Sequence, residues 1–134
     1  MKQGEVVELE IPSAPEYVAV VRCAVEGIAR RMCFDPDQIE DLKIAVGEAC
    51  TNAIKYGCPR GDFNNVDIRC IVCEGGLLVE VRNSVAGCFR PEVPARPDLR
   101  REGGLGLYLI RHLMDEVDFE WDQNVAVVKM LKRL

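Results

Sequence analysis

The stretch that decides the fold is residues 41–54, which read DLKIAVGEACTNAI. Its apolar and small side chains recur at the spacing of one helix face, at Leu42, Ala45, Val46, Ala49 and Ala53. Two polar residues, Glu48 and Asn52, interrupt this apolar sequence. They are four residues apart, so they lie on the same side of the predicted helix.

A carboxylate and an amide on one helix face suit two chemical tasks. The amide oxygen of Asn52 is a donor that Mg²⁺ accepts, because Mg²⁺ prefers oxygen ligands. The carboxylate of Glu48 is placed to orient or deprotonate an attacking hydroxyl group. Two structural interpretations of this pair need no chemistry: a solvated helix edge, and a local hydrogen bond between the two side chains.

A glycine-rich run, Gly103-Gly104-Leu105-Gly106, leads into a third helix predicted over 107–116. Glycines let phosphate oxygens approach the unpaired N–H groups of a helix N-terminus. The run is no Walker loop, since Gly-Lys-Ser/Thr is missing, and no dinucleotide fingerprint, since a proline-rich loop precedes it. A flexible hinge before the helix is the alternative.

Asn83 follows a strand predicted over 77–82. Its amide oxygen is a suitable acceptor for the amino group of adenine, and the alternative is a strand end followed by a turn. From residue 83 to residue 101 the sequence has no core pattern. A loop of that length in a compact domain is functional or disordered as a rule.

The remaining elements fix the fold class. A strand is predicted over 6–11, and helices begin at a Ser13–Glu16 capping box and at Asp35, with Gln38 completing a second box. Strands follow over 66–74, 77–82, 117–121 and 125–131, the first two joined by a turn at residues 75–76. The order predicts one α+β domain over 1–134: a two-layer sandwich whose mixed, mostly antiparallel sheet has helices on one face.

Composition narrows the function classes. The chain has 134 residues, 49% of them hydrophobic, and a net charge of −5. Without a basic block it is unsuited to direct nucleic-acid binding, and without a long apolar run it is not expected to enter a membrane. Five of the seven cysteines, Cys23, Cys33, Cys50, Cys70 and Cys73, sit in apolar patterns. We read them as buried free thiols of a cytoplasmic protein, and the Cys70/Cys73 spacing as strand residues on opposite faces.

Together the motifs resemble the Bergerat (GHKL) ATPase superfamily, which shares the histidine kinase-like ATPase fold. The resemblance rests on residues 48–54, which read EACTNAI, and on 103–117, which read GGLGLYLIRHLMDEV. The second run is similar to the anti-sigma-factor serine/threonine kinases of the RsbW and SpoIIAB type. Length and element order agree over nearly the whole chain.

The resemblance implies a role for each matched residue. Glu48 corresponds to the catalytic general base, and Asn52 to the ligand of Mg²⁺ and phosphate. The implied ATP site is completed by Asn83, Gly87, Gly103, Gly104, Gly106 and Leu107, with residues 88–102 as its lid. The implied partners are a sigma factor and a STAS-domain antagonist (an anti-anti-sigma protein), and the implied assembly is a homodimer. His112 is read as a surface residue of the third helix.

The chain departs from the family pattern at residues 83–87, which read NSVAG. Asn83 replaces an aspartate, and a neutral amide is the weaker acceptor. Val85 replaces a glycine and adds bulk there. The alternative function is therefore a non-catalytic partner-switching module with a degenerate nucleotide site. For the kinase, the sequence predicts that Glu48 and Asn52 face the amino end of the third helix.

Overall fold

The computed structural model describes residues 1–56, 65–84, 104–121 and 124–134. Five strands form one sheet in the order β1-β2-β3-β5-β4, and all four neighbouring pairs are antiparallel. The strands are β1 (Val6–Pro12), β2 (Asn65–Cys73), β3 (Gly76–Ser84), β4 (Glu116–Trp121) and β5 (Val125–Arg133).

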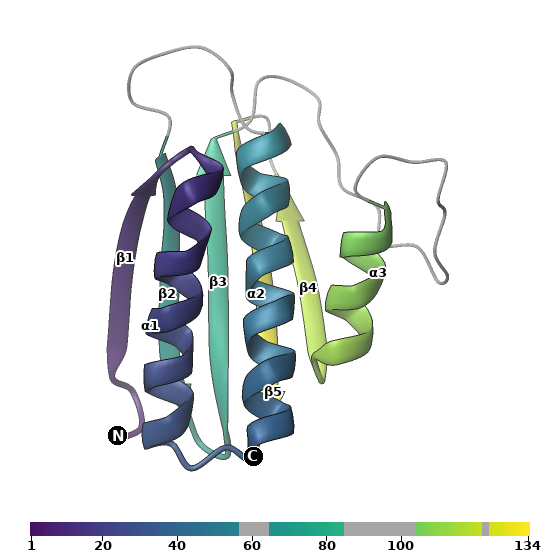
Figure 1. Cartoon of the computed structure of the whole chain (residues 1–134). Coiled ribbons are helices and arrows are strands. Elements are labelled where there is room, and N and C mark those ends of the chain that lie inside the picture. The colour runs from purple at the N-terminus through teal and green to yellow at the C-terminus, as the bar shows by residue number, and fades with distance from the viewer. Residues whose placement is uncertain (57–64, 85–103, 122–123) are drawn as a thin grey trace.

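The helices cover one face of this sheet (Figure 1). They are the short 3₁₀ helix η1 (Pro15–Tyr17) and the α-helices α1 (Val18–Arg31), α2 (Pro36–Tyr56) and α3 (Gly104–Leu113). Helix α2 lies between α1 and α3, and α3 stands beside β4 (Figure 1). The predicted two-layer α+β sandwich is confirmed.

The core lies between the sheet and the helices. Alternate residues of each strand point into it, so β2 contributes Val66, Ile68, Cys70 and Val72, all of them buried. The α2 stripe predicted from the sequence is buried as well, with Leu42, Ala45 and Val46 fully inaccessible. Burial of these faces fixes which side of α2 is left for polar residues.

Of the two predicted capping boxes, the second forms. The Gln38 N–H donates to Asp35 Oδ1 over 2.8 Å, and the Asp35 N–H donates to Gln38 Oε1 over 3.0 Å. The prediction of a box at Ser13 is wrong. Ala14 precedes η1 with no side-chain cap, because Pro15 opens a 3₁₀ turn ahead of α1.

The β2–β3 turn and helix α3 have other bounds in the structure than those predicted. The β2–β3 turn is at residues 74–75, one residue early, because Gly75 takes the left-handed conformation with φ of 73°. Helix α3 begins and ends three residues before the predicted limits. It stops at Leu113 because the Asp115 N–H donates to the Leu131 carbonyl of β5 over 2.9 Å, which starts strand pairing there.

Helix α1 ends in a left-handed cap at Cys33. The N–H groups of Phe34 and Cys33 donate to the carbonyls of Ala29 and Arg30, each over 3.1 Å. This is the Schellman pattern, and glycine is its usual left-handed residue. Here an exposed cysteine takes that place with φ of 67°.

We therefore expect Cys33→Gly to stabilise the fold by about 1 kcal/mol, because glycine removes the strain of a left-handed L-residue. Urea unfolding monitored by circular dichroism measures the change. Cys23→Gly is the matched control, since exposed Cys23 lies in the interior of α1 and should lose stability on the same replacement. Equal effects of the two substitutions would contradict this account of the cap.

The five described cysteines differ in exposure, and Cys73, predicted to be buried, is half-buried. Cys50 and Cys70 are buried as predicted, but Cys23 and Cys33 are exposed, so the prediction that they are buried is wrong. Both belong to α1 or its cap and point away from the sheet. Burial raises the pKa of the Cys50 thiol to about 12 and that of the Cys70 thiol to about 11.

Thiol reactivity should follow the same division, since the thiolate is the reacting form. In the native protein at pH 8, iodoacetamide should modify Cys23 and Cys33 and leave Cys50 and Cys70 unmodified until denaturant is added. Peptide mass spectrometry measures each site separately. Native labelling of Cys50 as fast as that of Cys23 would contradict the burial and the raised pKa.

Candidate functional site

Helix α2 presents Glu48 and Asn52 to the first turn of α3. A Cβ placed on Gly106 would lie 2.6 Å from Glu48 Oε2 and 3.5 Å from Asn52 Nδ2. Gly106 is buried, and both polar residues are half-buried. The carboxylate therefore rests in a space that exists because residue 106 has no side chain, and the predicted juxtaposition of the pair with the amino end of α3 is present.

Asn52 carries an unsatisfied group at this point. Its Nδ2 atom is buried and has no hydrogen-bond partner among the described residues. Buried polar atoms are normally paired, so an orphaned amide beside the first turn of α3 is a candidate donor to a polar ligand. An amide oxygen beside a carboxylate also fits Mg²⁺ in donor chemistry.

The first turn of α3 places backbone N–H donors beside this pair. The helix begins at Gly104, so the N–H groups of residues 104–106 have no acceptor within the helix. Together with the positive end of the helix dipole they favour an anion. The Leu107 side chain packs against the hydrophobic core. Gly87, Gly103 and the predicted lid over 88–102 lie outside the described residues.

The far end of α3 is held in place by Lys132 of β5. Its ammonium donates to the Leu113 carbonyl over 2.7 Å and pairs with Asp41 Oδ2 of α2 at 3.2 Å. The side chain of Lys132 is 12% exposed and that of Asp41 is 34% exposed, so only the lysine is shielded from solvent. This contact joins α2, α3 and β5 at the end of α3 opposite the glycines.

Asn83 lies within β3, as its penultimate residue, and is 8% exposed. Its Nδ2 donates to the Ala53 carbonyl of α2 over 3.2 Å. Ala53 directly follows Asn52 in the chain. The structure therefore brings Asn83 to the same end of α2 as the Glu48/Asn52 pair, as the motif order implied.

Two contacts were missed from the sequence. One is the Asn83–Ala53 bond, for which the sequence holds no signal. The other is Arg22 of α1, whose guanidinium covers Gly47: a Cβ on Gly47 would lie 2.5 Å from Arg22 Nε. A buried glycine inside a long helix was the available signal, since glycine weakens helices and needs a packing reason there.

The histidine of α3 lies apart from this site. His112 is exposed in the last turn of α3, as expected for a surface residue, and its ring lies 4.2 Å from that of Tyr108 at a tilt of 59°. Among the described residues no cluster of three or more His, Cys, Asp or Glu side chains is arranged for a metal.

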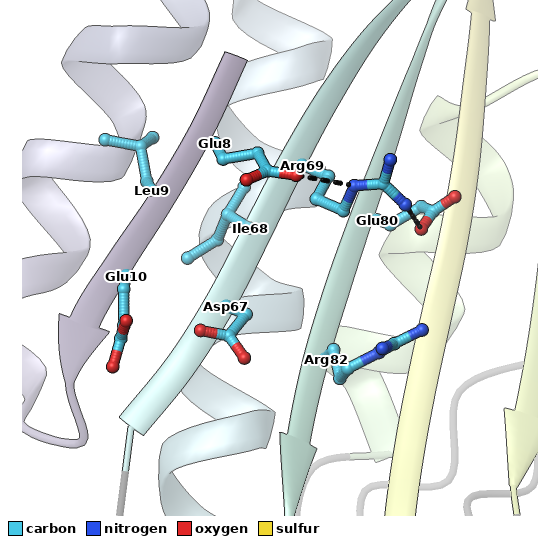
Figure 2. A pocket seen from close by; sticks show the side chains of 8 residues that line it. All are labelled: Glu8, Leu9, Glu10, Asp67, Ile68, Arg69, Glu80 and Arg82. Carbon is cyan, nitrogen blue, oxygen red and sulfur yellow. Dashed lines mark ion pairs between the residues drawn. The ribbon is translucent and has the colours of Figure 1, made fainter. Parts of the chain in front are cut away.

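A hollow of about 460 Å³ lies on the opposite face of the sheet, with the helices behind it (Figure 2). Three of its six charged side chains form ion pairs with each other, since Arg69 contacts Glu8 at 3.2 Å and Glu80 at 3.6 Å. Partial burial, with Glu10 next in effect, raises the pKa of Asp67. The sheet separates this surface from Glu48, so we do not assign it to the site.

Comparisons with known proteins agree on one family. The profile described as "Histidine kinase-like ATPase domain" matches residues 11–132. Serine-protein kinase RsbW of Bacillus pumilus is 40% identical, over 96% of this chain and 88% of the relative. The RsbW of Bacillus subtilis is 39% identical, over 92% of this chain and 83% of the relative.

Solved structures show the same fold at low identity. The RsbU and RsbW domains of a Mycobacterium tuberculosis protein match with a TM-score of 0.73 and 15% identity, over 97% of this chain and 32% of that one. The SiaB–SiaC complex of Pseudomonas aeruginosa matches with a TM-score of 0.70 and 14% identity. The match covers 93% of this chain and 88% of that one. None of the helices in the described residues is long and apolar enough to cross a bilayer. The chain belongs to the histidine kinase-like ATPase domain family, among the anti-sigma-factor kinases that include RsbW.

Proposed function

We propose that this chain is an ATP-dependent serine/threonine-protein kinase and an anti-sigma factor, which phosphorylates a STAS-domain antagonist and binds a sigma factor. The observation that carries the proposal is the placement of Glu48 and Asn52 against the first turn of α3. Relatives named serine-protein kinase RsbW support the activity. The neighbour SiaB, held in a complex with SiaC, supports action through another protein.

Each residue then has a definite task. Glu48 would accept the proton of the substrate hydroxyl as that oxygen bonds to the terminal phosphorus of ATP, while the bond from this phosphorus to the bridging oxygen breaks and ADP leaves. Asn52 would hold Mg²⁺ through its amide oxygen, and the backbone N–H groups of residues 104–106 would bind phosphate oxygens. When bound, Mg²⁺-ATP supplies the transferred phosphoryl group. Gly87, Gly103 and Leu107 are proposed to complete the nucleotide site.

Phosphate transfer to the partner tests this function. The protein is incubated with Mg²⁺, ATP labelled at the terminal phosphate and the candidate STAS-domain protein, with a serine-to-alanine form of that protein as control. Label that depends on the serine is the expected result. Nucleotide binding without any transfer would contradict the kinase and favour the second candidate, a non-catalytic partner-switching module, which the departures at Asn83 and Val85 motivate.

We also propose a single domain over 1–134 that forms a homodimer in the cytoplasm. The buried free thiols of Cys50 and Cys70 suit a reducing compartment. Light scattering coupled to gel filtration tests the dimer. A monomer at micromolar concentration, with the antagonist absent and present, would contradict that part of the proposal and leave the kinase chemistry unaffected.

A further inference from the structure

Helices α2 and α3 run in opposite directions, and two contacts show how they are aligned along each other (Figure 1). At one end Glu48 of α2 lies against Gly106 of α3, where an added Cβ would be 2.6 Å from Oε2. At the other end Lys132 of β5 joins Asp41 of α2 to the Leu113 carbonyl of α3. The two contacts are seven residues apart on both helices. Seven residues are two helical turns, or about 10 Å of helix axis.

Apolar packing alone defines this alignment loosely. Ile110 of α3 is fully buried, and Leu107 and Leu113 pack against the core. Such contacts are non-directional, so they select the buried face of α3 more strictly than its position along α2. A hydrogen bond has a defined length and angle. The Lys132 ammonium makes one of 2.7 Å to the last residue of α3, while it pairs with Asp41 at 3.2 Å.

Lysine suits this task in its chemistry and in its place. The last carbonyls of a helix have no partner within the helix, and a cation there also meets the negative end of the helix dipole. The side chain of Lys132 is 12% exposed, so water competes little for its donors. Its strand, β5, is paired on both sides, with β3 and β4. The ammonium is therefore a fixed point against which α2 and α3 are both placed.

We propose that Lys132 is a positioning residue for phosphate transfer, which sets the alignment of α3 along α2 and so keeps Gly106 against Glu48. The inference rests on the proposed function, because Lys132 acts through the proposed base from two helical turns away. Without the ammonium, α3 samples other positions along α2. The space beside Gly106 then no longer coincides with the Glu48 carboxylate.

Transfer rates at saturating ATP and antagonist test the proposal in a double-mutant cycle. Lys132→Met removes the ammonium and keeps the length of the side chain, and we expect the rate to fall at least about tenfold. In the Gly106→Ala background, where the carboxylate is already displaced, the same replacement should cost less than about threefold. An unchanged rate in Lys132→Met, or two losses that multiply, would overturn the inference.

Two control variants separate positioning from other effects of the replacement. Lys129→Met removes a lysine of the same strand that lies beside Glu80, on the face of the sheet without helices, and pairs with Glu120 at 2.9 Å. Ile28→Val removes a methylene from the core under α1, which α2 separates from α3 (Figure 1). Both should transfer phosphate at the wild-type rate below their melting temperatures. A loss in Ile28→Val equal to that in Lys132→Met would assign the effect to stability and contradict the inference.

Hydrogen exchange of the protein without nucleotide gives a readout that is independent of activity. In Lys132→Met the N–H groups of residues 108–110, which bond the carbonyls of the first turn of α3, should exchange faster than in the wild type, while those of α1 are unchanged. Unchanged exchange at residues 108–110 would overturn the inference. The proposed function fails separately. If exchange changes as expected but the wild type transfers no phosphate, the kinase proposal is wrong and the alignment of α3 by Lys132 stands.

Discussion

Replacing Glu48 with glutamine is expected to slow phosphate transfer to the antagonist by about 10²–10⁴-fold, the usual contribution of a general base. Glutamine keeps the size of the side chain and its place against Gly106 but accepts no proton. Nucleotide affinity and melting temperature should stay close to the wild type, because Asn52 and the α3 N–H groups are unchanged. Single-turnover transfer of labelled phosphate measures the effect.

Glu40→Gln is the matched control for this experiment. Glu40 is an exposed carboxylate on the same helix, and its ion pair with Lys43 at 3.8 Å is a weak surface contact. The control should transfer phosphate at the wild-type rate. Transfer that survives in Glu48→Gln, or in Glu48→Ala, would remove Glu48 from the role of base while leaving the fold as described.

A methyl group at residue 106 should have the second-largest effect on activity. In Gly106→Ala the new Cβ would lie 2.6 Å from Glu48 Oε2, so the carboxylate has to leave its place. Displacing a reacting group by about 1 Å costs on the order of 100-fold in rate, and we expect a loss of that size. Stability should be unchanged or higher, because the Glu48 side chain is able to rotate and alanine favours the helix.

Gly27→Ala is the control for the glycine replacement. Gly27 is an exposed residue of α1 with no atom within 4 Å of its added Cβ. It should gain about 0.5–1 kcal/mol of stability and keep full activity. Thermal melts and transfer rates of the two variants separate the effects. Full activity in Gly106→Ala would show that catalysis does not need the carboxylate against α3.

Local sequence patterns were sufficient to predict most of the fold. The reciprocal bonds of Asp35 and Gln38 follow from residue types three apart, and the alternation of β2 follows from strand geometry. The face shared by Glu48 and Asn52 follows from helical spacing. Where local rules competed, prediction failed, as at Ser13, whose cap was lost to the 3₁₀ turn at Pro15.

Contacts between distant segments had no such local signal. Nothing near Asn83 in the sequence indicates that its amide bonds the Ala53 carbonyl thirty residues earlier, because that bond depends on how α2 lies across β3. The end of α3 was also set from afar, by the Leu131 carbonyl and Lys132 of β5. The proximity of Gly106 to Glu48 was expected from family resemblance and not from spacing.

Mg²⁺-dependent nucleotide binding tests the central claim most directly, namely that Asn52 and the first turn of α3 hold a metal-bound nucleotide. Calorimetry should show ATP affinity falling at least about tenfold when Mg²⁺ is removed from the wild type. In Asn52→Ala the affinity should be low with or without the metal. Equal, Mg²⁺-independent binding by the wild type and Asn52→Ala would contradict the account.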